Sequence, residues 1–160
     1  MAGKGFFTHS SATNLTAATA KTLLDISTIA GSQIYIREVS IGGNSQAGGT
    51  DSGVCIQISR VLGAETAVAS SSTATIVADD PLNDLPFTTT ALNNITTEPS
   101  GVTILEEYYI QPEAGLYRIT YPLNNPLKLS GGNSTNLAHL YITALAAASE
   151  TLTVTVRGEE

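Results

Sequence analysis

Short runs of alternating apolar and polar residues recur along most of the chain. In residues 152–156 leucine and valine alternate with threonine, and residues 54–58 show the same period of two. This period places successive side chains on opposite faces of a strand, with one face buried. Stretches rich in Gly, Asn, Ser and Pro separate the runs, which is typical of an all-β sandwich or barrel. The pattern therefore predicts an all-β, antiparallel fold of eight or nine strands.

The alternation changes phase once, within residues 33–41. Apolar residues occupy even positions up to Ile36 and odd positions from Val39 onward. A shift of one residue would turn the apolar side chains to the other face of the sheet. Either both faces of this strand are buried, or a β-bulge lies near Arg37 and Glu38 and restores the phase.

Residues 136–148 are rich in alanine, a composition that also suits a helix. Apolar residues nevertheless alternate with polar or small ones at positions 140–144, which favours a strand. We predict a strand here and expect it to pair with the strand over residues 152–156 across a turn at residues 147–150.

The first 21 residues show no sustained period. They consist mostly of Gly, Ser, Thr and Ala, with two aromatic residues, Phe6 and Phe7. We predict a flexible N-terminal arm over residues 1–21 and a single domain over residues 22–160. The two phenylalanines could dock on a neighbouring subunit or fold back onto their own domain.

Residues 79–101 contain three prolines and little alternation. Proline lacks a backbone donor, so this stretch predicts loops with one edge strand around residues 87–92. Long ordered loops in a compact domain often contact a partner. The aspartates within residues 79–84 could hold Ca²⁺, but they lack the spacing of a calcium loop, and a solvated turn explains them more simply. The residues predicted to contact a neighbouring subunit are Phe6, Phe7, Asp79, Asp80 and Phe87.

Composition narrows the classes of function. The chain has 160 residues, of which 42% are hydrophobic and 13% charged, so it should fold as one domain around its own core. Its net charge of −7 would repel nucleic acid. It has no apolar run of about 18 residues that could span a membrane and no signal-peptide core, so we expect synthesis in a cytoplasm. The single cysteine excludes an intramolecular disulfide.

Groups that could carry catalysis are scarce. The two histidines, His9 and His139, lie far apart in the sequence, so the clustered ligands of a metal-binding barrel are missing. We expect His139 to face solvent or an interface. Cys55 lies within a predicted strand, where a buried and inert thiol is the usual case. Glu106 and Glu107 are adjacent, so on a strand they point to opposite faces. We predict no catalytic residue, no metal and no cofactor.

A chain with few catalytic groups and many threonine-rich strand faces suits a protein that works by forming interfaces. The same faces would also serve as ordinary solvent-exposed sheet. Sugar binding is a further possibility for a β-sandwich. The chain has six tyrosines but no tryptophan, which counts against that reading.

Several stretches, taken in order over residues 20–160, resemble jelly-roll capsid decoration (cement) proteins of tailed bacteriophages. The stretches follow one another in the same order as in that family and have a similar residue composition, including a Thr- and Pro-rich link over residues 88–99. The stretches are AKTLL at 20–24, IYIREVSI at 34–41, VCIQISR at 54–60, GLYRI at 115–119, PLKLSGG at 126–132 and GEE at 158–160.

The resemblance implies a jelly-roll β-sandwich that forms a homotrimer on the outer surface of a phage head. The trimer would bind the major capsid protein and stabilise the lattice, so the virion surface is the expected location after synthesis in the host cytoplasm. It implies no catalytic residue and no cofactor. The alternative is a receptor- or glycan-binding trimeric jelly roll of a virion fibre or cell-surface assembly.

Overall fold

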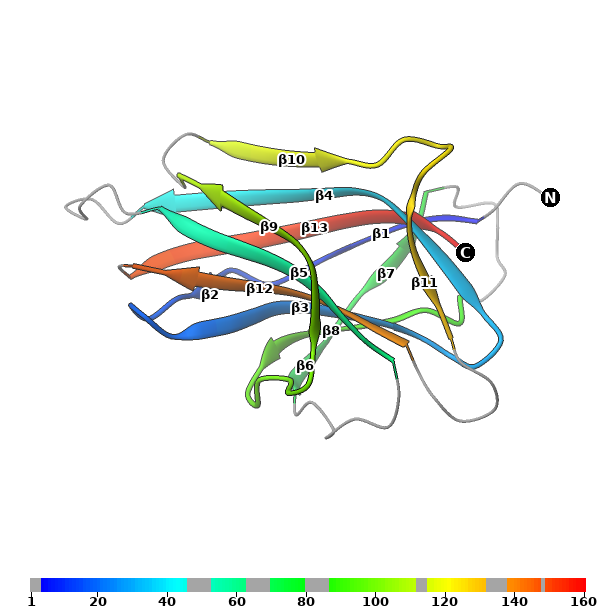
Figure 1. Cartoon of the computed structure of the whole chain (residues 1–160), viewed down its shortest axis with the longest axis horizontal. Coiled ribbons are helices and arrows are strands. Elements are labelled where there is room, and N and C mark those ends of the chain that lie inside the picture. The colour runs from blue at the N-terminus through cyan, green and yellow to red at the C-terminus, as the bar shows by residue number, and fades with distance from the viewer. Residues whose placement is uncertain are drawn as a thin grey trace.

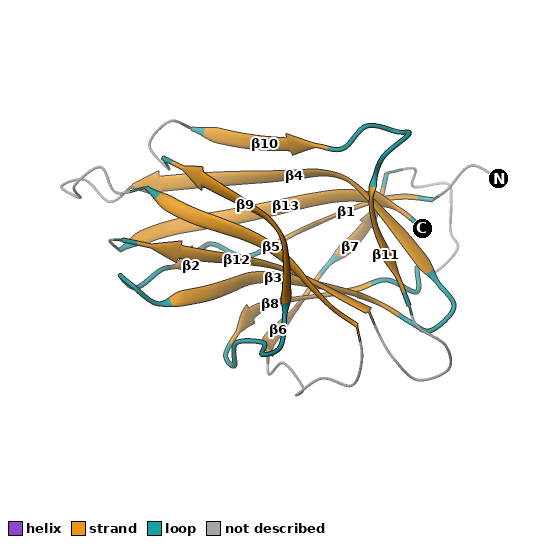
Figure 2. Ribbon diagram, in the orientation of Figure 1, coloured by secondary structure: helices purple, strands orange, loops and turns teal. Residues whose placement is uncertain are grey.

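The computed structural model describes residues 4–45, 53–62, 70–79, 87–111, 115–131, 138–147 and 149–160. Across these ranges the chain forms thirteen strands and no helix (Figures 1 and 2). All strand pairs are antiparallel, and the strands form two sheets that pack face to face. The predicted antiparallel β-sandwich is confirmed, as is a strand rather than a helix at residues 138–146.

One sheet, called sheet A, has seven strands. In order they are β10 (Leu116–Thr120), β4 (Gln33–Ser45), β13 (Glu150–Glu159), β1 (Gly5–His9) and β7 (Ile76–Ala78), with β11 (Leu127–Ser130) also on β4 and β2 (Thr13–Asn14) on β13. Sheet B has six strands. In order they are β6 (Ser70–Ala74), β8 (Thr90–Ile95), β3 (Ala20–Thr28), β12 (Ala138–Ala146), β5 (Val54–Leu62) and β9 (Thr103–Ile110). Consecutive strands cross between the sheets at β3–β4–β5, which makes the sandwich jelly-roll-like.

β12 and β13 are consecutive, but they lie in different sheets. β12 pairs with β3 and β5, whereas β13 pairs with β4 and β1. The predicted pairing of these two strands is therefore wrong. Each has one largely apolar face, and the two faces meet across the core instead of lying side by side. Alternation shows which face of a strand is buried, but it does not determine which other strand lies beside it.

Of the two alternatives for residues 33–41, the structure shows the bulge, which lies in β4. Arg157 of β13 lies opposite Glu38, but the next residue, Gly158, lies opposite Ile36, so Arg37 has no partner in this ladder. The extra residue restores the inward phase, and Ile36 and Val39 are both fully buried. The bulge also divides the other side of β4, which pairs with β11 before Arg37 and with β10 after it.

The N-terminal segment belongs to the sandwich. β1 lies between β13 and β7, one strand in from the edge of sheet A, and Phe6 is fully buried in the core. The prediction of a flexible arm is wrong over β1 and β2, while residues 1–3 lie outside the described part. Gly158 explains why Phe6 fits: a Cβ atom at Gly158 would come within 2.8 Å of the Phe6 ring.

Candidate functional site

The structure separates the residues predicted to contact a neighbouring subunit. Phe6 is fully buried, so its predicted place at an interface is wrong. Phe87 packs edge-on against Phe6, with the ring centroids 5.9 Å apart, and so contributes to the same core. Phe7 is half-buried and Asp79 is exposed, and their contact with a neighbour stays a prediction. Asp80 and the rest of the candidate calcium segment, residues 80–84, lie outside the described part.

The segment before β8 is fixed by the carboxylate of Glu160. The backbone N–H and hydroxyl groups of Thr88 and Thr89 all donate to it, over 2.6–3.0 Å. Burial alone would raise the pKa of Glu160, but these hydrogen bonds outweigh burial and lower it. The predicted edge strand is corrected here, because β8 begins only at Thr90 and has neighbours on both sides.

His139 forms part of a polar cluster that the sequence did not suggest. Its Nδ1 lies 3.0 Å from Oδ1 of Asp25, and only 14% of its side chain is exposed. Asp25 is buried on the adjacent strand β3, and the imidazole stacks on Tyr141. Of the two alternatives for His139, solvent or an interface, the solvent-facing one is therefore corrected. In the register Asp25 lies opposite Tyr141 and diagonal to His139, a relation that only the strand pairing reveals.

A carboxylate joins the edges of the two sheets. Glu106 of β9 accepts hydrogen bonds from the hydroxyls of Tyr108 at 2.7 Å and Tyr121, just after β10, at 2.6 Å. It lies on the same face of β9 as Tyr108 and Ile110, opposite the buried Ile58 of β5. A second bulge, at Leu105, shifts the register between β9 and β5, so Ile104 does not share this face and is 48% exposed.

The two tyrosines of this cluster should resist ionisation. Burial and the bond to Glu106 raise the pKa of Tyr108 from 10.0 to about 12, and the same causes raise the pKa of Tyr121. The pKa of Tyr108 is higher in the folded protein than in the unfolded chain. The protonated Tyr108 therefore stabilises the fold fully below pH 10, and this contribution is lost as the pH rises through about 12.

The substitution Glu106→Gln should shift the tyrosinate absorbance change of both tyrosines to lower pH. Identical titrations of the variant and the wild type would contradict this assignment.

Large apolar side chains are exposed along the same edge. We call Ile104 on β9, Leu116 and Tyr117 on β10, and Leu123 after β10 the β9–β10 edge. Leu116 is 61% exposed and Leu123 78%. β9 and β10 are the outermost strands of their sheets and lie on one side of the sandwich (Figure 1). Exposed edge strands with apolar side chains are sites for pairing with another chain.

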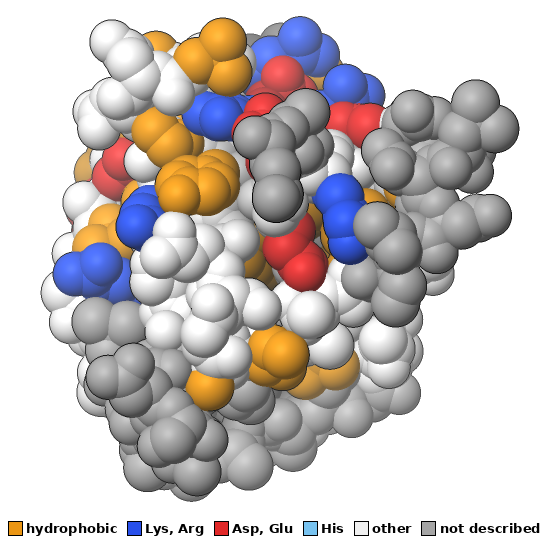
Figure 3. Space-filling view, turned by 90° about the vertical axis from the view of Figure 1, so that its right-hand side faces the viewer, with side chains coloured by type: hydrophobic (Ala, Val, Ile, Leu, Met, Phe, Trp, Pro, Cys, Tyr) orange, Lys and Arg blue, Asp and Glu red, His pale blue; other side chains and the backbone are white. Residues whose placement is uncertain are grey.

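The opposite edges are less suited to association. β6 consists of serine, threonine and alanine, and β7 has only three residues. Figure 3 shows basic and acidic side chains interleaved on one end of the sandwich, so neither sign of charge dominates there. Arg37 of β4 and Glu159 of β13 form an ion pair of 2.8 Å.

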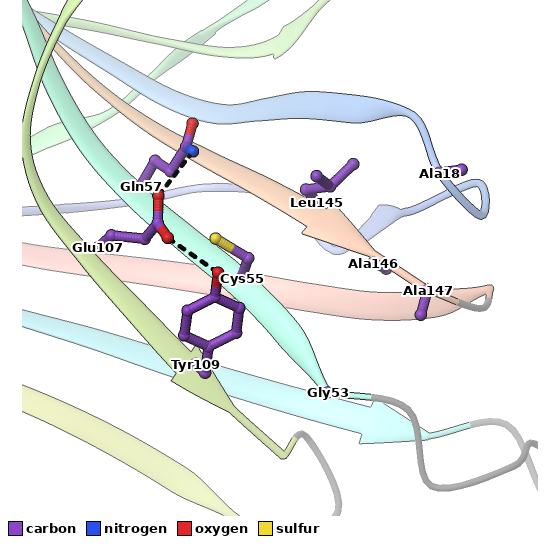
Figure 4. A pocket seen from close by; sticks show the side chains of 9 residues that line it. All are labelled: Ala18, Gly53, Cys55, Gln57, Glu107, Tyr109, Leu145, Ala146 and Ala147. Atoms are coloured by element: carbon purple, nitrogen blue, oxygen red, sulfur yellow. Dashed lines mark hydrogen bonds between the residues drawn. The ribbon is translucent and has the colours of Figure 1, made fainter.

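A hollow of about 420 Å³ lies on the outer face of sheet B (Figure 4). Within it, the Glu107 carboxylate accepts a hydrogen bond from the Tyr109 hydroxyl at 2.9 Å and one from the Gln57 amide at 3.0 Å. Burial, followed by the neighbouring Glu107, raises the pKa of the Cys55 thiol, which fits the predicted inert cysteine. The lining residues are Ala18, Gly53, Cys55, Gln57, Glu107, Tyr109, Leu145, Ala146 and Ala147.

Comparison of the chain with protein-family models, curated proteins and solved structures gives no match. Within the described ranges, His, Cys, Asp and Glu residues form no group of three that could hold a metal ion. Over the same part of the chain, no helix is long and apolar enough to cross a membrane. The candidate sites are thus the β9–β10 edge and the hollow beside Tyr109.

Proposed function

We propose that this chain is a structural protein of a phage virion, which self-associates as a trimer and binds the outer surface of the head. The observation that carries the proposal is the β9–β10 edge, where two outermost strands lie on one side of the sandwich and each carries exposed large apolar side chains (Figure 1). Burying such an edge against another copy would remove its apolar surface from water.

The resemblance to decoration proteins gives the proposal its second support, since the observed jelly-roll-like sandwich is the fold that it implies. The mechanism would be linkage: a protein that binds only the assembled lattice stabilises that lattice by its binding free energy. A trimer strengthens weak contacts with the major capsid protein, because binding of the first subunit raises the effective concentration of the other two.

Native mass tests the self-association. Light scattering during size exclusion should give three times the chain mass of 16.6 kDa for the wild type. Leu116→Lys should shift the protein toward monomer, because a charge in a buried apolar edge is costly and lysine blocks edge pairing. Thr73→Lys, a substitution of an exposed residue on β6 at the edge of sheet B opposite β9, is the control and should remain trimeric. A monomeric wild type would refute the trimer.

Binding to heads tests the capsid role separately. The wild-type chain should co-sediment with expanded heads built from the major capsid protein of the same virus, and Leu116→Lys should bind much more weakly because it loses multivalency. A trimer that does not co-sediment with these heads would exclude the capsid role and leave the self-association standing.

A further inference from the structure

The hollow on sheet B presents an exposed aromatic ring in a fixed orientation. Tyr109 on β9 is 75% exposed, the largest exposed fraction of any aromatic side chain in the described part. Its hydroxyl donates to Glu107, two residues earlier on the same face of the strand. This bond holds the ring beside the hollow (Figure 4). A rigid tyrosine offers apolar contact area at low entropic cost.

The polar groups around the ring suit a ligand rich in hydroxyls. A carboxylate can accept about four hydrogen bonds, and Glu107 receives contacts from Tyr109, Gln57 and Cys55. Acceptor capacity is therefore left on an exposed carboxylate, whose bonds to hydroxyls are short and strong. The Gln57 amide adds a neutral group that can both donate and accept.

The floor of the hollow is made of small side chains. Ala18, Gly53, Ala146 and Ala147 leave space beside the ring, and Leu145 adds apolar surface. Ala18 adopts a φ of 56°, the left-handed region that favours glycine, and its N–H donates to the Ala146 carbonyl at 2.8 Å. A methyl group is thus kept in the hollow at a position where glycine would be less strained.

We propose that this hollow binds a carbohydrate unit. One apolar face of a pyranose would stack on the Tyr109 ring, and ring hydroxyls would donate to Glu107 and to the Gln57 carbonyl. The volume of about 420 Å³ lies in the range of small-molecule sites, roughly 300–1,000 Å³. An arginine of a partner protein could also bind here, by pairing with the Glu107 carboxylate and stacking on the Tyr109 ring. The neutral Gln57 amide, which can both donate and accept, favours the sugar. The proposal does not depend on self-association or on binding to heads.

The test begins with the full chain on an array of immobilised saccharides that includes neutral hexoses, amino sugars and acidic sugars. The best binder is then titrated calorimetrically against the wild type and variants. Tyr109→Ala should weaken binding about tenfold or more, since stacking and the fixed Glu107 are both lost. Glu107→Gln should weaken it without removing the ring, and Ala18→Gly should weaken it while relieving backbone strain.

The matched control is Tyr35→Ala. Tyr35 also donates its hydroxyl two residues back along a strand, to Gln33 at 2.9 Å, but it lies on sheet A outside the hollow. This variant should bind the saccharide like the wild type. Binding of no arrayed saccharide, or equal binding by Tyr109→Ala, would overturn the proposal. So would an arginine-containing peptide that occupies the hollow when no sugar does. Native mass is recorded for every variant, so a change in assembly is recognised separately.

Discussion

Phe6→Ala is expected to lower the free energy of unfolding by about 4 kcal/mol, because truncating a fully buried phenylalanine removes apolar contacts and leaves a cavity. Phe6 is well enclosed. Its ring packs on Phe87 and lies against Gly158, and its strand is hydrogen-bonded to β13 and β7. Urea unfolding, followed by far-ultraviolet circular dichroism, measures the effect.

Phe7→Ala is the matched control, since Phe7 is the neighbouring residue of the same type but only half-buried on the opposite face. Its truncation should cost clearly less than that of Phe6. The pair of variants also distinguishes a strand from an arm. If residues 5–9 were a flexible arm, both substitutions would leave the unfolding free energy unchanged, and the placement of β1 would be wrong.

His139→Leu is expected to cost about 3 kcal/mol of stability, because it removes the partner of a buried carboxylate. Asp25 is fully buried and 3.0 Å from the imidazole, so solvent cannot replace the lost interaction. Leucine keeps most of the side-chain volume, so the effect reports the polar interaction more than packing. Chemical unfolding at neutral pH gives the difference.

A double-mutant cycle measures the interaction energy between Asp25 and His139 separately from their contacts with other residues. In an Asp25→Asn background the same His139→Leu substitution should lower the free energy of unfolding by about 1 kcal/mol. The reason is that a buried neutral amide without a hydrogen-bond partner costs less than a buried carboxylate without one. Equal costs in the two backgrounds would show that the two side chains are not coupled and that the imidazole stabilises the fold through other contacts.

Local pattern was sufficient to predict most strands and their buried faces. Burial of one face enforces alternation, so residues 152–156 and 54–58 could be assigned correctly. The phase change near Arg37 was visible in the sequence but allowed either a bulge or two buried faces, and only the strand pairing shows that it is a bulge.

Features that depend on strand neighbours could not be predicted. β1 is five residues long, and its burial depends on Gly158, which lies more than 150 positions away in the sequence. The Asp25–His139 pair and the hollow have the same origin, because each combines residues from strands that become adjacent only in sheet B. Alternation contains no information about which strands are adjacent or in what register.

The pairing of β1 with β13 has a consequence for how the chain folds. Among the described strands β1 is synthesised before all the others and β13 after them, yet the two are neighbours in sheet A. Sheet A therefore cannot close until residues 150–159 have been synthesised. Contacts of such long range make folding slow, on the order of milliseconds to seconds. Until then the Phe6 side of β1 remains exposed to water, and apolar surface exposed in this way favours aggregation of the nascent chain.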